Sequence, residues 1–201
     1  MVRYALIPSQ ISLLLVVLIP KPQGGERPIR IFPTLLRLVD RWYRWSHGAR
    51  WLARQHPGPF YGLKGRIVED AVWRHGLLAE WDQAGGQAAV TLLFDIIKAF
   101  EHVRHVPLWE AAKRNGFDLV LMRWIMYTFR MARRFQLYGG CSDECWVRRS
   151  IVPGISFADI FMRLSVTDAL AQVQQSIPKC IMAVVSDDIQ VTVFGKPLQV
   201  G

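Results

Sequence analysis

The sequence has few cysteines and no long uninterrupted apolar segment. Its three cysteines, Cys141, Cys145 and Cys180, form no even set for disulfides, and the first two lack the further ligands of a tetrahedral zinc site. They indicate reduced thiols, which are typical of an intracellular protein of the nucleus or cytoplasm. The unbroken apolar run Ile11–Ile19 is too short to span a bilayer, so we expect no membrane partner and no secretion. A targeting segment within Ala5–Pro20 is the alternative to a buried strand there.

The sequence also lacks the short motifs of the common enzyme classes. It contains no Walker loop, no GxGxxG, no HExxH and no Ser/His/Asp arrangement, and it has no repeats or low-complexity tract. About half of its 201 residues are apolar, which is enough to bury a core and excludes a disordered tail. The sequence therefore predicts one or two folded domains whose chemistry depends on other residues.

Positive charge is in excess, with a net charge of +9. Residues 1–60 contain nine Lys and Arg against Glu26 and Asp40, and residues 113–149 contain eight against three acidic residues. Lys and Arg release counterions when they neutralise phosphates, so this bias favours a polyanionic partner. A basic surface without such a partner is the alternative, and charge alone does not decide between them.

The pattern of apolar residues predicts a mixed α and β chain. Strands are expected at Leu13–Ile19, Ala88–Phe94, Ile181–Val185 and Ile189–Phe194, and a hairpin is expected from Phe135–Tyr138 and Cys145–Arg149. Helices are expected at Pro33–Trp51, Val68–Asp82, Pro107–Asn115, Asp118–Arg130 (capped by Asp118) and Phe157–Gln172, with a loop at Gln55–Gly65. Acidic residues therefore stand at strand ends, which directs attention to them.

Asp95 ends one predicted strand, and Asp187-Asp188 lies between two others. An isolated aspartate pair is most often a turn, because its side chains bond nearby backbone amides. Here both flanks are apolar, and two adjacent carboxylates repel one another unless a cation joins them. If the strands are neighbours, three carboxylates converge, and such an oxygen-only site suits Mg²⁺, with two ions clamping a phosphoryl displacement.

Five segments in family order resemble the reverse transcriptases of LINE-type (non-LTR) and related retroelements. The segment Phe94–Val103 resembles their first catalytic motif, and Val184–Asp188 resembles their second acidic motif. Arg148–Gly154 is similar to the template-and-nucleotide loop of the family. The fingers motifs are represented by Leu18–Pro22 with Arg27-Pro28-Ile29, and by Gly65–Ala71.

The resemblance implies a function and a set of site residues. Asp95, Asp187 and Asp188 would be the catalytic carboxylates that bind two Mg²⁺ ions. The nucleotide-binding residues would be Phe100 (a steric gate against a ribose 2′-hydroxyl), Lys21, Arg27 and Arg30 (contacts to the triphosphate), and Gly154 (close backbone approach). The structural alternatives are a core phenylalanine, a solvated basic loop and a plain turn.

The implied fold is α+β, with the fingers and palm of a right-hand polymerase, an antiparallel palm sheet packed on helices, and no thumb. Residues 1–87 would be the N-terminal part of the fingers and residues 88–201 the palm, with a second fingers segment at about 107–148. The expected activity is RNA-templated DNA synthesis as part of a retroelement, with an RNA template, a DNA primer and dNTPs as partners.

Two positions depart from the family pattern. Val185 stands where an aromatic residue is usual, and Val152-Pro153-Gly154 lacks the usual glutamine. Two alternatives therefore stay open: an inactive polymerase-derived fragment that binds nucleic acid, and an RNA-directed RNA polymerase. Phe100 speaks against the second, because a small or polar residue there would admit ribonucleotides.

Overall fold

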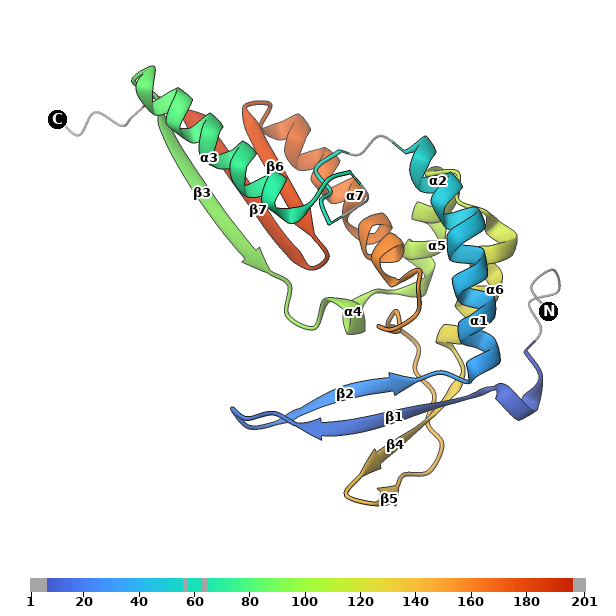
Figure 1. The fold of residues 1–201 in the computed structure, drawn as a ribbon. Coiled ribbons are helices and arrows are strands. Elements are labelled where there is room, and N and C mark those ends of the chain that lie inside the picture. Colours follow the sequence, from blue (N-terminus) through green and yellow to red (C-terminus); the bar gives the residue numbers. More distant parts are fainter. Residues whose placement is uncertain (1–6, 56–57, 63–64, 197–201) are drawn as a thin grey trace. The chain divides into compact units, whose positions relative to one another are not determined.

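The fold is α+β and is divided between two compact units (Figure 1). The computed structural model describes residues 7–55, 58–62 and 65–196. The first unit comprises Met1–Gln55 and Phe100–Ser165, and the second comprises His56–Ala99 and Val166–Gly201. The division into fingers and palm at residues 87 and 88 is a functional one and stays a prediction. Within the described ranges, no helix is both long enough and apolar enough to cross a membrane.

A four-stranded sheet organises the first unit, in the order β2-β1-β4-β5. Its strands are β1 (Leu13–Pro20), β2 (Glu26–Ile31), β4 (Ala132–Leu137) and β5 (Gly140–Cys141). The predicted strand at Leu13–Ile19 is confirmed, and Leu14 and Val16 are buried on one face of it. β1 pairs antiparallel with β2 and parallel with β4. β2 was not predicted, since Pro28 argues against a strand; an edge strand tolerates the missing amide.

Helices cover the first unit and supply its aromatic core. They are η2 (Ser9–Ile11), α1 (Thr34–Tyr43), η3 (Arg44–Gly48), α2 (Ala49–Arg54), α4 (Ala99–His102), α5 (His105–Arg114), α6 (Leu119–Phe129) and α7 (Ala158–Ser176). The helix expected at Pro33–Trp51 is interrupted by the π-helical turn η3. α6 begins as predicted, because the Asp118 carboxylate accepts hydrogen bonds from the Val120 and Leu121 amides at 2.9 and 3.1 Å. The boundary between the units lies in α7, after Ser165.

The hairpin expected from Phe135–Tyr138 and Cys145–Arg149 is wrong in its second strand. Tyr138 and Gly139 both have positive φ, at 47° and 84°, so they make a tight turn that pairs Leu137 with Gly140 directly. The ladder then ends, because the Ser142 hydroxyl takes the hydrogen bond of the Phe135 amide. Cys145 and Arg149 form only isolated bridges, to Arg133 and Arg104.

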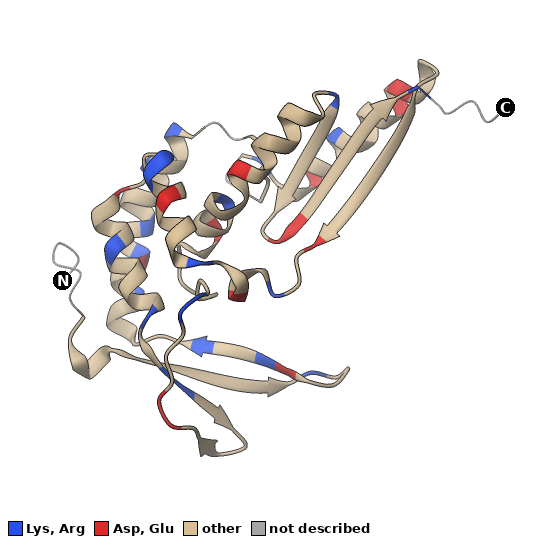
Figure 2. Cartoon of the chain, turned by 180° about the vertical axis from the view of Figure 1, so that it is seen from behind, with Lys and Arg blue, Asp and Glu red and all other residues tan. Residues whose placement is uncertain are grey.

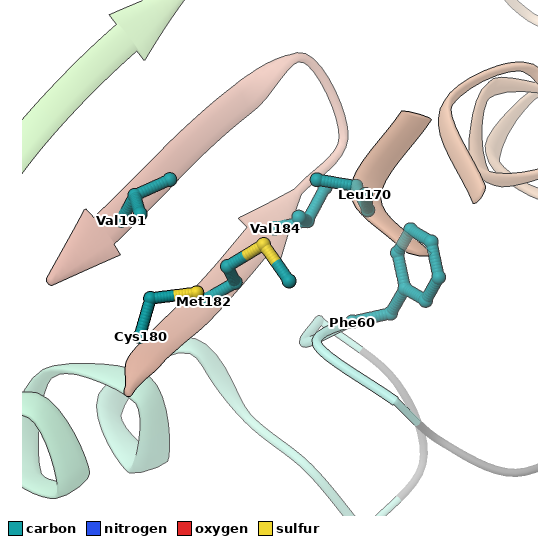
Figure 3. Packing of buried hydrophobic residues seen from close by; sticks show 6 residues of the cluster. All are labelled: Phe60, Leu170, Cys180, Met182, Val184 and Val191. Atoms are coloured by element: carbon teal, nitrogen blue, oxygen red, sulfur yellow. The ribbon is translucent and has the colours of Figure 1, made fainter. Parts of the chain in front are cut away.

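A three-stranded antiparallel sheet organises the second unit, in the order β3-β7-β6. Its elements are α3 (Val68–Ala84), β3 (Ala88–Asp95), β6 (Cys180–Val185) and β7 (Asp188–Gly195), together with the second part of α7. The predicted strands on both sides of the aspartate pair are confirmed. Leu170 of α7 packs with Phe60, Met182 and Val184 on one face of the sheet (Figure 3). Because side chains alternate along a strand, Ala183 lies on the other face, where it packs with Ala71 of α3.

Candidate active site

The three predicted carboxylates stand at one end of the β3-β7-β6 sheet. Asp95 is the last residue of β3, Asp188 is the first residue of β7, and the two are direct partners in the antiparallel register. The neighbour of β3 is therefore β7, the strand that follows the aspartate pair, while β6 lies one strand further away. Figure 2 shows acidic positions at the end of β3 and at the turn between β6 and β7.

Asp187 lies in the turn that joins β6 to β7. Val185 pairs with Asp188, so Ser186 and Asp187 are the only residues between the paired positions, and Ser186 has a φ of 58°. The turn removes Asp187 from the alternation that would send adjacent strand residues to opposite faces. Its carbonyl oxygen accepts a hydrogen bond from the amide of Ile96 at 3.4 Å, which ties the turn to the segment after β3.

The end of β6, directly before the turn, is held by apolar packing and backbone hydrogen bonds. Val184 is 1% exposed, and its backbone bonds to the loop before α3 through the Pro59 carbonyl and the Tyr61 amide, at 2.8 and 2.9 Å. Val185, at the position where the family that the sequence resembles has an aromatic residue, packs with Tyr61 and Ala183 on the face of α3. A β-branched valine suits this half-buried strand end.

The carboxylates stand at the same sheet end without forming a compact cluster. Asp95 and Asp188 are exposed, and Asp187 is half-buried. Within the described ranges, no group of three or more His, Cys, Asp or Glu side chains is arranged to hold a metal ion. Like charges in water move apart unless a cation joins them, so exposed carboxylates of this kind stay separate by themselves. Their oxygen atoms are the hard ligands that suit Mg²⁺, and the metal stays a prediction.

The predicted nucleotide contacts belong to the first unit. Lys21 and Arg27 are exposed on the hairpin of β1 and β2. Arg30 of β2 is different, because its Nη2 donates a 2.9 Å hydrogen bond to Oε1 of Glu101 and its side chain is only 7% exposed. Lys21 and Arg27 are thus available to a ligand, while Arg30 is committed to an ion pair.

Phe100 and Gly154 are placed by the loop that follows β5. Phe100 is half-buried in α4, and its carbonyl oxygen accepts a hydrogen bond from the amide of Ile151 at 2.9 Å. Gly154 is exposed and has a φ of 99°, a conformation that side chains disfavour. A Cβ atom placed on it would lie 3.9 Å from the carbonyl oxygen of Arg30, so the backbone of the loop passes close to β2.

Sequence reasoning missed the polar side chains that hold this loop. They are Asp40, Arg44, His105, Arg133 and Ser150, and Glu101 was missed as the partner of the neighbouring Arg30. Ser150 and Glu101 lie within segments that resemble family motifs, but the resemblance assigns no role to either position, and a charged residue in a mostly polar stretch gives no sign that it will be buried. The one available signal was the position of Ser150 immediately before the apolar pair Ile151-Val152.

Comparisons with known proteins bear on the fold. No protein-family model and no curated protein matches the sequence. Among solved structures, the chain is similar to apo telomerase from Candida tropicalis truncated from its C-terminal domain (TM-score 0.64, 11% identity, 94% of this chain and 45% of that chain). It is also similar to the telomerases of Candida albicans and Candida tropicalis in complex with the TWJ fragment of telomeric RNA. The Candida albicans structure has a TM-score of 0.59 and 10% identity, and the match covers 93% of this chain and 38% of that chain. The Candida tropicalis complex has a TM-score of 0.66 and 12% identity, and the match covers 93% of this chain and 37% of that chain.

The chain spans less than half the length of each of these telomerases. At such low identity the likeness concerns the fold, and it extends over nearly all of the present chain. Telomerase is a reverse transcriptase, so the likeness supports the predicted type of fold, while the assignment to the LINE-type family stays a prediction. The chain therefore has a reverse-transcriptase-like fold.

Proposed function

We propose that the chain carries out RNA-templated DNA synthesis, adding nucleotides from dNTPs to the 3′ end of a primer. The observation that carries this proposal is the register of the second unit, which pairs Asp95 with Asp188 and leaves Asp187 in the adjoining turn. The reverse-transcriptase-like fold supports the assignment of this sheet as a palm. The order of the family motifs supports a retroelement as the source.

Asp95, Asp187 and Asp188 would hold two Mg²⁺ ions, which supply positive charge to the attacking and leaving oxygens of the reaction. The primer 3′-hydroxyl gives its proton to solvent as its oxygen attacks the α-phosphorus of the dNTP, the bond from that phosphorus to the bridging oxygen breaks, and pyrophosphate leaves. Because Asp187 is tied through its carbonyl to Ile96, the turn and the end of β3 present their carboxylates from one framework. Such preorganisation removes part of the entropic barrier of the reaction.

The first unit would bind the polyanionic substrates. Lys21 and Arg27 are exposed cations on one hairpin, suited to the triphosphate or the template backbone. Phe100, half-buried beside the Ile151 amide, would exclude a ribose 2′-hydroxyl. Two of the similar telomerases are complexed with RNA, and the basic charge of the present chain favours the same class of ligand.

A primer-extension assay tests the proposal. The purified chain is given an RNA template, a DNA primer, dNTPs and Mg²⁺, alongside Asp187→Asn and the control Asp82→Asn, which removes an acidic charge from α3 in the same unit. Extension by the wild type and the control, with loss in Asp187→Asn, supports the proposal. Salt-sensitive duplex binding without extension would instead identify an inactive nucleic-acid-binding fragment.

The same assay separates the two polymerase activities. Extension with NTPs but not with dNTPs would identify an RNA-directed RNA polymerase. Phe100→Ala should admit ribonucleotides if the side chain is the steric gate, because it opens the space that a 2′-hydroxyl needs. Unchanged sugar discrimination in that variant would remove the gate assignment while leaving polymerisation intact.

A further inference from the structure

The loop of residues 150–156 in the first unit is anchored on both sides of an exposed tip. Ile151 and Val152 are fully buried, and Ile155 is 7% exposed. Between them Gly154 is exposed, with its φ of 99°. Surface loops are normally more mobile than the elements that they connect, and the buried residues on both sides of Gly154 restrict this one.

The beginning of the loop is fixed by three hydrogen bonds to Ser150. The Ser150 amide donates to the carbonyl oxygen of Val103 at 2.8 Å, and Nε2 of His105 donates to the Ser150 carbonyl oxygen at 2.8 Å. Nη2 of Arg133 donates to the Ser150 hydroxyl at 3.2 Å. Ser150 has a φ of 106°, which is unfavourable for a residue with a side chain and persists only where surrounding contacts impose it.

Two buried polar side chains thus converge on one strained residue. His105 and Arg133 are each 4% exposed, and burial lowers the pKa of His105. Burial, aided by the nearby charge of Arg30, lowers the pKa of Arg133 to about 10, which still leaves the guanidinium charged at neutral pH. Burying such groups is costly unless they are hydrogen-bonded; both side chains bond to Ser150, and Nη2 of Arg133 also donates to the carbonyl oxygen of Phe129.

The end of the loop is fixed by a second pair of side chains. Oδ2 of Asp40, a buried residue, accepts a 2.6 Å hydrogen bond from the amide of Ser156. Nε of Arg44 donates to the Ser156 carbonyl oxygen at 2.8 Å, and its Nη2 donates to Asp159 at 2.9 Å. Arg44 begins the π-helical turn η3, a feature that is frequent at functional sites. Gly48 makes room for it, since a Cβ there would lie 3.0 Å from the Arg44 Cδ.

The loop in turn fixes the residues proposed to meet the nucleotide. The Ile151 amide bonds to the carbonyl oxygen of Phe100, directly after Ser150. On its other side Gly154 passes beside the backbone of Arg30, and Arg30 is paired with Glu101, the neighbour of Phe100. A change in the position of Ser150 is therefore transmitted to Phe100 through a single hydrogen bond.

We propose that Ser150, held by Arg133 and His105, is a positioning residue that sets how the loop and Phe100 receive the nucleotide sugar. This inference rests on the proposed polymerase function. We call Ser150 with its partners Arg133 and His105 the loop clamp. Changes to the clamp are expected to alter the KM for dNTP and the discrimination against NTP more than kcat, because the clamp contacts neither the carboxylates nor the phosphates. Asp40 and Arg44 hold the other end of the same loop.

The test replaces Ser150 in two ways. Ser150→Ala removes the hydroxyl that accepts from Arg133 and leaves the backbone strained, and Ser150→Gly removes the hydroxyl and the strain together, so it folds even where the alanine variant does not. The matched control is Ser165→Ala, which removes a serine hydroxyl of the same unit that bonds within α7 to the Phe161 carbonyl. We expect the KM for dNTP to rise on the order of tenfold in both Ser150 variants and discrimination against NTP to fall, with no change in the control.

Hydrogen exchange of the loop amides separates the possible failures. If the loop exchanges as fast in the wild type as in Ser150→Gly, the clamp does not exist and the inference is overturned whatever the enzyme does. If the wild type polymerises and the Ser150 variants have a lower Tm but an unchanged KM for dNTP and unchanged discrimination against NTP, the clamp is only structural. The inference is then overturned, while the proposed function stands. Wild type that neither extends a primer nor binds dNTP overturns the proposed function, and the inference with it.

Discussion

The Arg30–Glu101 ion pair predicts an asymmetry between the two residues that form it. The Arg30 side chain is 7% exposed, while that of Glu101 is 36% exposed. Nε of Arg30 is buried and has no hydrogen-bond partner among the described residues, and the charge of Arg133 is close enough to interact with that of Arg30. Glu101→Ala would leave the buried charge of Arg30 without a partner and close to the charge of Arg133. Arg30→Met would instead remove the buried charge and keep most of the apolar volume of the side chain.

The expected costs follow from this difference. Breaking a fully buried ion pair by removing one partner costs about 3–5 kcal/mol, and a hydrogen bond to a charged group contributes about 1.5–3 kcal/mol. Because water reaches more than a third of Glu101, we expect Glu101→Ala to cost about 2 kcal/mol and Arg30→Met about 1 kcal/mol or less. For a chain of 201 residues these values correspond to falls in Tm of about 6 °C and about 3 °C or less.

Urea and thermal unfolding of the two single variants and the double variant measure these costs. The Arg134–Glu144 pair of the same unit is the control, because its partners are 46% and 40% exposed, and Glu144→Ala should cost less than about 0.5 kcal/mol. The double variant should be about as stable as Arg30→Met, because the Arg30 charge that would lack a partner is absent from both. An Arg30→Met variant as destabilised as Glu101→Ala, or more so, would refute the reasoning.

Three further predictions concern other parts of the chain. Asp118→Ala should lower the free energy of unfolding by about 1 kcal/mol, measured in urea, and Asp118→Asn should lower it less because the amide oxygen still caps α6. Burial lowers the pKa of His75 and of His105 from 6.5, so the unfolded chain takes up protons first as the pH falls. Stability should therefore decrease from about pH 6.5 down to the folded-state pKa values and then level off; a flat profile between pH 7 and 5 would contradict both shifts. Gly48→Ala should lower Tm, because its Cβ would lie 3.1 Å from a ring carbon of Phe157; an unchanged Tm would show that the site relaxes.

The elements around the carboxylates could be predicted from the sequence because local pattern decides them. Apolar runs ended by acidic residues predict β3, β6 and β7 with boundaries close to those observed, and Asp118 predicts the start of α6. The register that pairs Asp95 with Asp188 could not be predicted, because it depends on which strand lies beside β3. The strand order places Asp95 beside Asp188, and the convergence of the three carboxylates on one metal site stays a prediction.

The loop clamp could not be predicted because it depends on burial across the fold. Arg133 reads as one of several basic residues in its stretch, yet it is buried and bonds to Ser150, seventeen positions away. Asp40 and Ser156 meet across a still longer separation. The π-helical turn at Arg44 could not be predicted either, because the amphipathic pattern continues through it and indicates an uninterrupted α-helix.

The most direct test of the account is Mg²⁺-dependent incorporation of a single dNTP by wild type, Asp95→Asn and Asp188→Asn. Asparagine keeps the shape of each side chain and removes the charge at the two positions that the register places opposite one another. We predict that each substitution slows incorporation by at least about a hundredfold, as expected when a charge-stabilising group is lost from an active site, while primer–template binding is kept. Incorporation at the wild-type rate in both variants would contradict the assignment of this sheet end as the active site.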